Sequence, residues 1–155
     1  MFDQTLRIGT RDSQLALWQA HKVADLLEAS HINTQMVATK SAGDLNLTKP
    51  IYAMGIQGVF TKALDIALLE NRVDIAVHSL KDVPTQLADG LLLAAVLERG
   101  SAGDILIQTN KFDLESCSTI ATGSLRRKAQ WLHRYPNHHL VDLRGNVQTL
   151  SLIHI

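Results

Sequence analysis

A lysine and an aspartate stand side by side where an apolar run of the chain ends. The run Asp74-Ile75-Ala76-Val77 is followed by His78-Ser79-Leu80-Lys81-Asp82-Val83-Pro84. A short β-branched run that stops at a polar cluster and a proline is typical of an interior strand that leads into a loop. Because open α/β sheets bind ligands at the ends of their strands, Asp82 is the first candidate for a catalytic group. For an isolated Lys-Asp pair, the alternative is an ordinary solvated turn.

Three further junctions pair an arginine with a residue suited to begin a helix. They are Thr10-Arg11-Asp12-Ser13, Thr122-Gly123-Ser124-Leu125-Arg126-Arg127 and Arg144-Gly145-Asn146. Free backbone amides and the helix dipole make such turns anion sites, and an arginine adds a bidentate partner for carboxylate or phosphate. The sequence therefore predicts a ligand with several negative groups. The arginines and Lys81 would hold it, while Asp82 would stabilise positive charge or donate a proton.

The composition limits the class of partner. The chain has 155 residues, of which 46% are hydrophobic, which is enough for one domain or for one domain and part of another. Its 15 basic and 15 acidic residues balance, so no overall field attracts nucleic acid or a membrane surface. Phosphate binding by Arg126 and Arg127 on a nucleic acid is the weaker alternative, because apolar residues share their predicted helix. No P-loop motif is present.

Neither a signal peptide nor an apolar run near the roughly 18 residues of a membrane span is evident, so we expect a cytoplasmic protein. The single cysteine, Cys117, agrees with a reducing compartment. Seven histidines are present without metal-site spacing, so we expect no metal ion.

The apolar pattern predicts strands that alternate with helices, which indicates an α/β fold with largely parallel sheets. Strands are expected at residues 5–10, 35–39, 74–77, 91–97, 105–107, 119–121 and 140–143, and helices at about 13–29, 59–71 and 124–134. Residues 41–58 have weak periodicity and are expected to form a long loop. The polar, glycine-rich segment 98–104 is the expected boundary between a first lobe, 1–98, and a second lobe, 99–155.

Taken together, these motifs resemble those of porphobilinogen deaminase, also called hydroxymethylbilane synthase. The motifs that carry the resemblance are Arg7-Ile8-Gly9-Thr10-Arg11, His78 to Pro84, Ser124-Leu125-Arg126-Arg127 and Leu143-Arg144-Gly145-Asn146-Val147, in the order of the family. The resemblance extends from residue 4 to about residue 149. It implies two lobes of the periplasmic-binding-protein type with mixed, largely parallel sheets.

The family joins four porphobilinogen units head to tail with release of ammonia, which gives hydroxymethylbilane for tetrapyrrole and haem biosynthesis. It extends a covalently bound dipyrromethane cofactor. The resemblance implies that Asp82 is the catalytic aspartate and that 41–58 is the mobile loop over the active site. It also implies a set of substrate- and cofactor-binding residues: Arg11, Ser13, Ser79, Lys81, Thr122, Ser124, Arg126, Arg127, Arg144, Gly145 and Asn146.

The chain departs from the family pattern in the loop and at its end. Ala53 and Gln57 stand where many relatives carry lysines, and Leu150 stands where they carry arginine. We expect a truncated product whose tail from Leu150 to Ile155 is foreign to the family. The second lobe would be incomplete, and the third domain with the cofactor's cysteine would be absent. Cys117 matches no cofactor motif and is not expected to be that cysteine.

The chain alone is therefore expected to be a monomer with little or no activity. A non-catalytic, two-lobed module that binds small anions is the alternative function, and the missing export signal and Asp82 disfavour it. An inert, poorly folded fragment is a third possibility.

Overall fold

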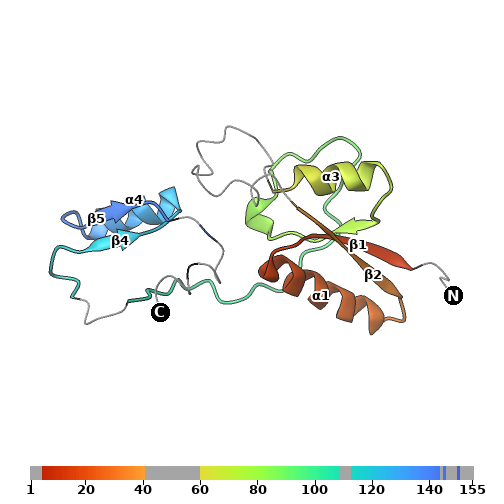
Figure 1. Ribbon diagram of the computed structural model, residues 1–155, viewed down its shortest axis with the longest axis horizontal. Helices are drawn as coiled ribbons and strands as arrows, with labels where there is room; N and C mark the ends of the chain where they lie inside the picture. The colour runs from red at the N-terminus through yellow and green to blue at the C-terminus, as the bar shows by residue number, and fades with distance from the viewer. Residues whose placement is uncertain (1–4, 41–59, 109–112, 144, 146–149, 151–155) are drawn as a thin grey trace. The chain divides into compact units, whose positions relative to one another are not determined.

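The computed structural model describes residues 5–40, 60–108, 113–143, 145 and 150. These residues form two compact units, one built on residues 5–40 and 60–96 and the other on residues from 97 onward (Figure 1). The loop predicted at 41–58 lies outside the described residues. The lobe boundary predicted at residue 98 stays a prediction.

The first unit is built on a three-stranded parallel sheet. Strand β1 (Leu6–Arg11) lies in the middle, between β2 (Thr34–Thr39) and β3 (Ile75–Ala76), so the strand order is β2-β1-β3. In this register Ile8 lies opposite both Met36 and Ile75. The strands predicted at 5–10, 35–39 and 74–77 are confirmed, although β3 is shorter than expected.

Two helices cover opposite sides of this sheet, α1 (Gln14–Glu28) and α3 (Lys62–Leu69) (Figure 1). On the α1 side, Ile8 packs with Ala20 and Ala24, and all three are almost completely buried. Small alanines on α1 let the helix approach the sheet closely, while larger apolar residues pack around this core.

The α3 side of β1 depends on a glycine. A Cβ atom at Gly9 would lie 3.1 Å from a methyl carbon of Leu64 and 3.1 Å from one of Val73. Leu64 and Val73 are themselves buried, so they have little room to move away. Because side chains alternate across a strand, Ile8 serves one face of the sheet and Gly9 the other.

The second unit contains a β-α-β motif. Strands β4 (Thr119–Ala121) and β5 (His139–Val141) pair in parallel, and α4 (Leu125–Arg134) connects them. Ile120 and Leu140 lie opposite each other, with 8% and 9% of their surface exposed. The α/β class with parallel sheets is thus confirmed in both units.

A histidine completes the packing around α4. The Trp131 indole nitrogen donates to Nδ1 of His138 at 3.2 Å, and Nε2 of His138 lies 3.1 Å from the Leu114 carbonyl oxygen. An imidazole with its hydrogen on Nε2 satisfies both contacts, because indole only donates and a carbonyl only accepts. His138 is therefore a structural residue, 7% exposed, rather than a metal ligand.

Two predicted strands are wrong. Residues 91–97 and 105–107 have no strand structure, and most of their large apolar side chains are well exposed, with Leu92 at 78% and Ile105 at 85%. Their residue types suit a strand, but a strand also needs a neighbour to accept its backbone hydrogen bonds, and no described strand pairs with either segment. The helix predicted at 59–71 is shorter, Lys62–Leu69, and the last strand begins one residue earlier than expected.

Within the described ranges, no helix is long and apolar enough to cross a membrane. The same residues contain no group of three or more His, Cys, Asp or Glu side chains placed to hold a metal ion.

Candidate functional site

The site in the first unit is built where β1 and β3 end. β1 ends at Arg11, and β3 leads through residues 77–79 into a short 3-10 helix, η2 (Leu80–Asp82). Both strands run in the same direction, so their carboxyl ends share one edge of the sheet. Nη1 of Arg11 lies 3.8 Å from Oδ2 of Asp82, and the two side chains are only 18% and 21% exposed. A strand with neighbours on both sides and helices on both faces marks a place where open α/β sheets bind ligands.

Phe60 fixes the position of the Arg11 guanidinium. The central carbon of this group lies 4.2 Å from the centroid of the Phe60 ring, which is a cation-π contact. Held in this way, Arg11 is near Asp82, but 3.8 Å is longer than a hydrogen bond. The Asp82 side chain keeps 21% of its surface exposed, so a ligand N–H group can reach its carboxylate.

Hydrogen bonds hold the backbone on both sides of Asp82. The Asp82 amide donates to the Ser79 carbonyl at 2.9 Å, and the Val83 amide donates to the Leu80 carbonyl at 3.2 Å. The Ser79 hydroxyl donates to Oε1 of Gln19 at 3.0 Å, which connects η2 to α1. Asp82 is therefore held on a short turn braced against a helix.

The other predicted residues of this unit have different surroundings. Ser13 is the N-cap of α1, where its hydroxyl accepts from the Ala16 amide at 3.4 Å. Lys81 is exposed beside Asp82. Ser13 lies at the amino end of α1, where the first backbone amides of the helix can bind an anionic group. The exposed Lys81 side chain can pair with an anionic group as well.

His78 belongs to this site, although the sequence marked it only as the end of a strand. Burial lowers the pKa of His78, the Asp65 and Asp82 carboxylates oppose that shift, and Arg11 adds to it. Its Nε2 atom is buried and finds no hydrogen-bond partner among the described residues. A neutral imidazole thus lies within electrostatic range of the Arg11–Asp82 pair. The change from apolar Val77 to polar Ser79 is the sequence signal that could have pointed to His78.

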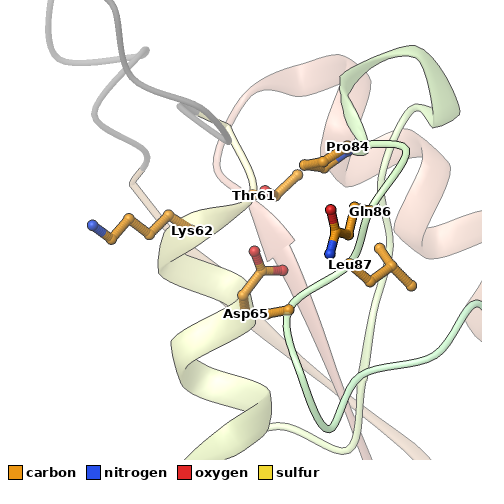
Figure 2. Close-up of a pocket in the computed structure, with 7 residues that line it drawn as sticks. Thr61, Lys62, Asp65, Pro84, Gln86 and Leu87 are labelled. Carbon is orange, nitrogen blue, oxygen red and sulfur yellow. The ribbon is translucent and has the colours of Figure 1, made fainter.

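A shallow pocket lies beside the site rather than at it. It opens between the beginning of α3 and the segment that follows η2, and the residues that line it are Thr61, Lys62, Asp65, Pro84, Gln86, Leu87 and Ala88 (Figure 2). The Lys62 side chain points away from the hollow in this view, whereas the Asp65 carboxylate and the Gln86 amide face it. Neither Arg11 nor Asp82 lines the pocket, so the chemistry of the sheet edge is separate from it.

The second unit positions another cluster of predicted residues at the start of α4. The Ser124 hydroxyl caps the helix by accepting from the Arg127 amide at 3.3 Å, and the Thr122 hydroxyl accepts from the Ser124 amide at 3.2 Å. A Cβ atom at Gly123 would lie 2.5 Å from the Leu143 carbonyl oxygen. Only glycine lets the turn after β4 approach the end of β5 so closely.

Arg127 already has a partner in this unit. Its guanidinium donates through Nε and Nη2 to the two carboxylate oxygens of Asp104, which is a bidentate ion pair. The Asp104 contact raises the pKa of Arg127, and the same contact lowers the pKa of Asp104. Arg126, next to it, is exposed and contributes in a smaller way to the lowered pKa of Asp104. No sequence motif marked Asp104, which lies in the segment predicted as a lobe boundary.

The third predicted junction is mostly outside the described residues. Arg144 and Asn146 belong to that part, whereas Gly145 is described and has a φ of 143°. Such a positive φ favours glycine. The structure therefore brings Arg11 and Asp82 together in one unit, groups Thr122, Ser124 and Arg127 in the other, and leaves the roles of all these residues as predictions.

Comparison with known proteins shows the family of this chain. Residues 6–151 match the family model described as "Porphobilinogen deaminase, dipyromethane cofactor binding domain". The chain belongs to the porphobilinogen deaminase family. It is also 46% identical over 151 residues to the porphobilinogen deaminase of Syntrophomonas wolfei subsp. wolfei (strain DSM 2245B / Goettingen). That match covers 94% of this chain and 49% of the relative, so the chain spans about half the length of this porphobilinogen deaminase.

The family model names a dipyrromethane cofactor, and the described residues fit such a group. A polycarboxylate needs cations and hydroxyl donors, and both units offer them at strand and helix ends, as Lys81, Arg126, Thr122 and Ser124 show. Cys117 is the one cysteine of the chain, and its thiol donates to the Asn137 carbonyl oxygen at 2.9 Å.

Proposed function

We propose that this chain provides the substrate- and cofactor-binding half of a hydroxymethylbilane synthase, with Asp82 as the catalytic group. The observation that carries the proposal is the arrangement of Arg11, Asp82 and Phe60 at the ends of β1 and β3. It offers one shielded carboxylate beside a fixed cation, which suits a substrate with negative side groups and a reaction that develops positive charge.

The Asp82 carboxylate fits two steps of the condensation of porphobilinogen. It can accept a hydrogen bond from the pyrrole N–H, which places the ring. When the C–N bond of the protonated aminomethyl group breaks, the electron pair leaves with nitrogen as ammonia, and the remaining cation spreads over the pyrrole. A carboxylate near that ring lowers the energy of the charge. The dipyrromethane cofactor, when bound, supplies the pyrrole carbon to which the first unit is joined.

The binding residues would act on the acetate and propionate groups. Arg11 and Lys81 lie beside Asp82, and Arg126 lies at the start of α4, where Thr122 and Ser124 supply hydroxyl groups. Arg127 would have to exchange its Asp104 partner for a substrate carboxylate. Ser13, Ser79, Arg144, Gly145 and Asn146 complete the proposed set.

We further propose that the 155-residue chain alone makes no hydroxymethylbilane and does not carry the cofactor on Cys117. The Cys117 thiol is exposed and donates to an ordinary backbone acceptor, the Asn137 carbonyl oxygen. Mass spectrometry of the intact chain after incubation with porphobilinogen tests both points. Added pyrrole mass on Cys117, or product in the assay, would contradict them.

The catalytic role of Asp82 needs an active protein. Residues 1–149 joined to the remaining part of the Syntrophomonas wolfei relative give a full-length chimera for this purpose. In it, Asp82→Asn should lower turnover by about 100-fold or more while porphobilinogen still loads, as seen in the mass of the trapped complexes. Asp89→Asn changes an exposed aspartate of the same unit and serves as the matched control. Unchanged turnover of Asp82→Asn would refute the role, and ligand binding without any turnover in the parent would favour a simple anion-binding module.

A further inference from the structure

The shallow pocket beside the site combines an apolar wall with polar groups. Its volume is about 280 Å³, just below the range of about 300–1,000 Å³ that is usual for small-molecule sites, so a small ligand fits it. Pro84, Leu87 and Ala88 supply the apolar part of the wall. The Asp65 carboxylate and the Gln86 amide face the hollow (Figure 2). An apolar wall with a few convergent polar groups is typical of a binding site for a small molecule.

The Asp65 carboxylate is a charge without a counterion among the described residues. No lysine, arginine or histidine of the described ranges forms an ion pair with it. Lys62, three residues before it on α3, points away from the hollow (Figure 2). Asp65 lies in the first turn of α3, where the helix dipole offsets only about half of a unit charge. The hollow therefore presents a negative charge to a ligand.

A buried hydroxyl in the wall of the same pocket also has no partner. Thr61 is 1% exposed, and its Oγ1 atom forms no hydrogen bond with another described residue. Thr61 is the N-cap of α3, but its side chain does not cap the helix. The missing cap and the unpaired oxygen both cost stability. A hydrogen-bond donor that enters the pocket along this wall would give the oxygen a partner.

We propose that this pocket binds a small organic cation, namely a primary ammonium group on a short apolar stem. An ammonium has three N–H donors, which match the Asp65 carboxylate, the Gln86 amide oxygen and the Thr61 hydroxyl. The stem would lie against Pro84 and Leu87. A divalent metal ion fits less well, because one carboxylate supplies too few ligands for it. The inference does not depend on the proposed function.

Asp65 also connects the pocket electrostatically to a residue of the candidate site. Burial lowers the pKa of His78, the Asp65 and Asp82 carboxylates raise it, and Arg11 lowers it. A cation bound at Asp65 would offset the effect of that carboxylate, so occupancy of the pocket should lower the pKa of His78 further. His78 does not line the pocket, so its imidazole is a reporter that does not touch the ligand.

The test titrates the 155-residue chain with butylammonium at constant ionic strength, followed by the amide resonances of residues 84–88 and the imidazole resonances of His78. Butanol and butyrate keep the apolar stem but replace the cation by a neutral or an anionic group. We expect saturable binding of butylammonium and none of butanol or butyrate over the same range of concentration. The dissociation constant should be on the order of 1 mM, since so small a ligand makes few contacts. A pH titration at saturating butylammonium should show the lower pKa of His78.

Variants of the lining residues test the proposed contacts. Asp65→Asn keeps the shape of the side chain and removes its charge, so it should weaken butylammonium binding by about tenfold or more. Asp89→Asn removes the same charge from an exposed position that does not line the pocket, and it should leave the affinity unchanged. Thr61→Val removes the hydroxyl and should weaken binding by a smaller factor. Gln86→Glu adds a second carboxylate and should strengthen binding, an increase that a loss of folding cannot produce.

Three outcomes would overturn the proposal. The first is butanol binding as tightly as butylammonium, and the second is equal affinity of the Asp65→Asn and Asp89→Asn variants. The third is a pKa of His78 that stays the same when butylammonium saturates the chain. Because no turnover is measured and Asp82 is kept in every variant, failure here is distinct from failure of the proposed function.

Discussion

Arg11 and Asp82 face each other across the ends of two parallel strands, with Nη1 and Oδ2 separated by 3.8 Å. Arg11 and Asp82 come close together because side chains alternate between the two faces along β1. Ile8 packs on the α1 side, whereas Gly9, and by alternation Arg11, lie on the α3 side. Phe60 precedes α3 and lies under the guanidinium on that same side. A one-residue change in the register of β1 would therefore remove Arg11 from the site.

Under the proposed function, replacing Phe60 by leucine should weaken porphobilinogen binding to the first unit. The contact with Arg11 is partly exposed, and such cation-π contacts contribute about 0.5–1 kcal/mol, which corresponds to roughly a two- to fivefold loss of affinity. Titration followed by NMR resonances of the first unit measures this change. Phe60→Tyr keeps the face of the ring and should bind like the parent. Equal binding by the leucine variant would show that the ring does not orient Arg11.

Gly9→Ala should destabilise the first unit. The added Cβ would come within 3.1 Å of methyl groups on Leu64 and Val73, both of which are buried. Overpacking of this kind costs about 1–3 kcal/mol in the free energy of unfolding. Urea unfolding, followed by resonances of the first unit, gives that free energy.

Gly100→Ala is the control for Gly9→Ala, because nothing lies within 4 Å of a Cβ atom at that position. It removes the same backbone freedom from the unfolded chain and should leave stability unchanged or raise it slightly. A Gly9→Ala variant as stable as the Gly100→Ala variant would mean that α3 can move away from the sheet at little cost.

Periodicity located the elements that have a continuous apolar face. Helix α1 follows the expected spacing from its Ser13 cap, and strands β1 and β2 lie within a residue or so of their expected positions. Residues 105–107 have an equally good strand pattern, yet they form no strand. The difference is that β1 finds a strand on each side, whereas no described strand lies beside 105–107.

The residues of the site likewise divide into those that the sequence indicates and those that only the fold brings together. Asp82 and Arg11 stood out because charged residues at strand ends have a physical meaning in the sequence itself. Phe60 read as one apolar position of a helix, because only the fold places it under Arg11. The pairing of Asp104 with Arg127 spans 23 residues, and no local spacing rule links two charges at that separation.

The Arg7–Asp74 pair should give the first unit a pH-dependent stability. The Arg7 side chain donates to both oxygens of Asp74, and the Arg7 amide donates to one of them. These hydrogen bonds lower the pKa of Asp74 from its ordinary value of 3.8 to about 2. The stabilisation is therefore fully present above about pH 4 and is lost as the pH falls through the folded-state pKa, because protonation then removes the charge.

Asp74→Asn should show a smaller loss of stability than the parent between pH 5 and pH 2. The pair is about one third exposed, with side-chain values of 35% and 29%, so solvent screening keeps its contribution small. Glu70→Gln, which breaks a more exposed pair with Arg72, should leave the pH profile of the parent in place. Thermal unfolding at a series of pH values compares the three proteins, and parallel profiles for parent and Asp74→Asn would contradict the assignment.

Gly123→Ala should destabilise the second unit. The effect should be larger than that of Gly100→Ala or Gly103→Ala, the two other glycines of this unit whose surroundings are described. The Cβ atom at position 123 would lie 2.5 Å from the Leu143 carbonyl oxygen, and a backbone atom at the end of β5 cannot rotate away as a side chain can. We expect a loss of about 1–3 kcal/mol in stability and a shift in the resonances of Thr122 and Ser124, which the turn positions. Gly103→Ala is the matched control, since its Cβ would meet only the Ser101 hydroxyl at an ordinary 3.7 Å. If the two variants unfold at the same urea concentration, the close approach between the β4 turn and β5 is not what holds the start of α4 in place.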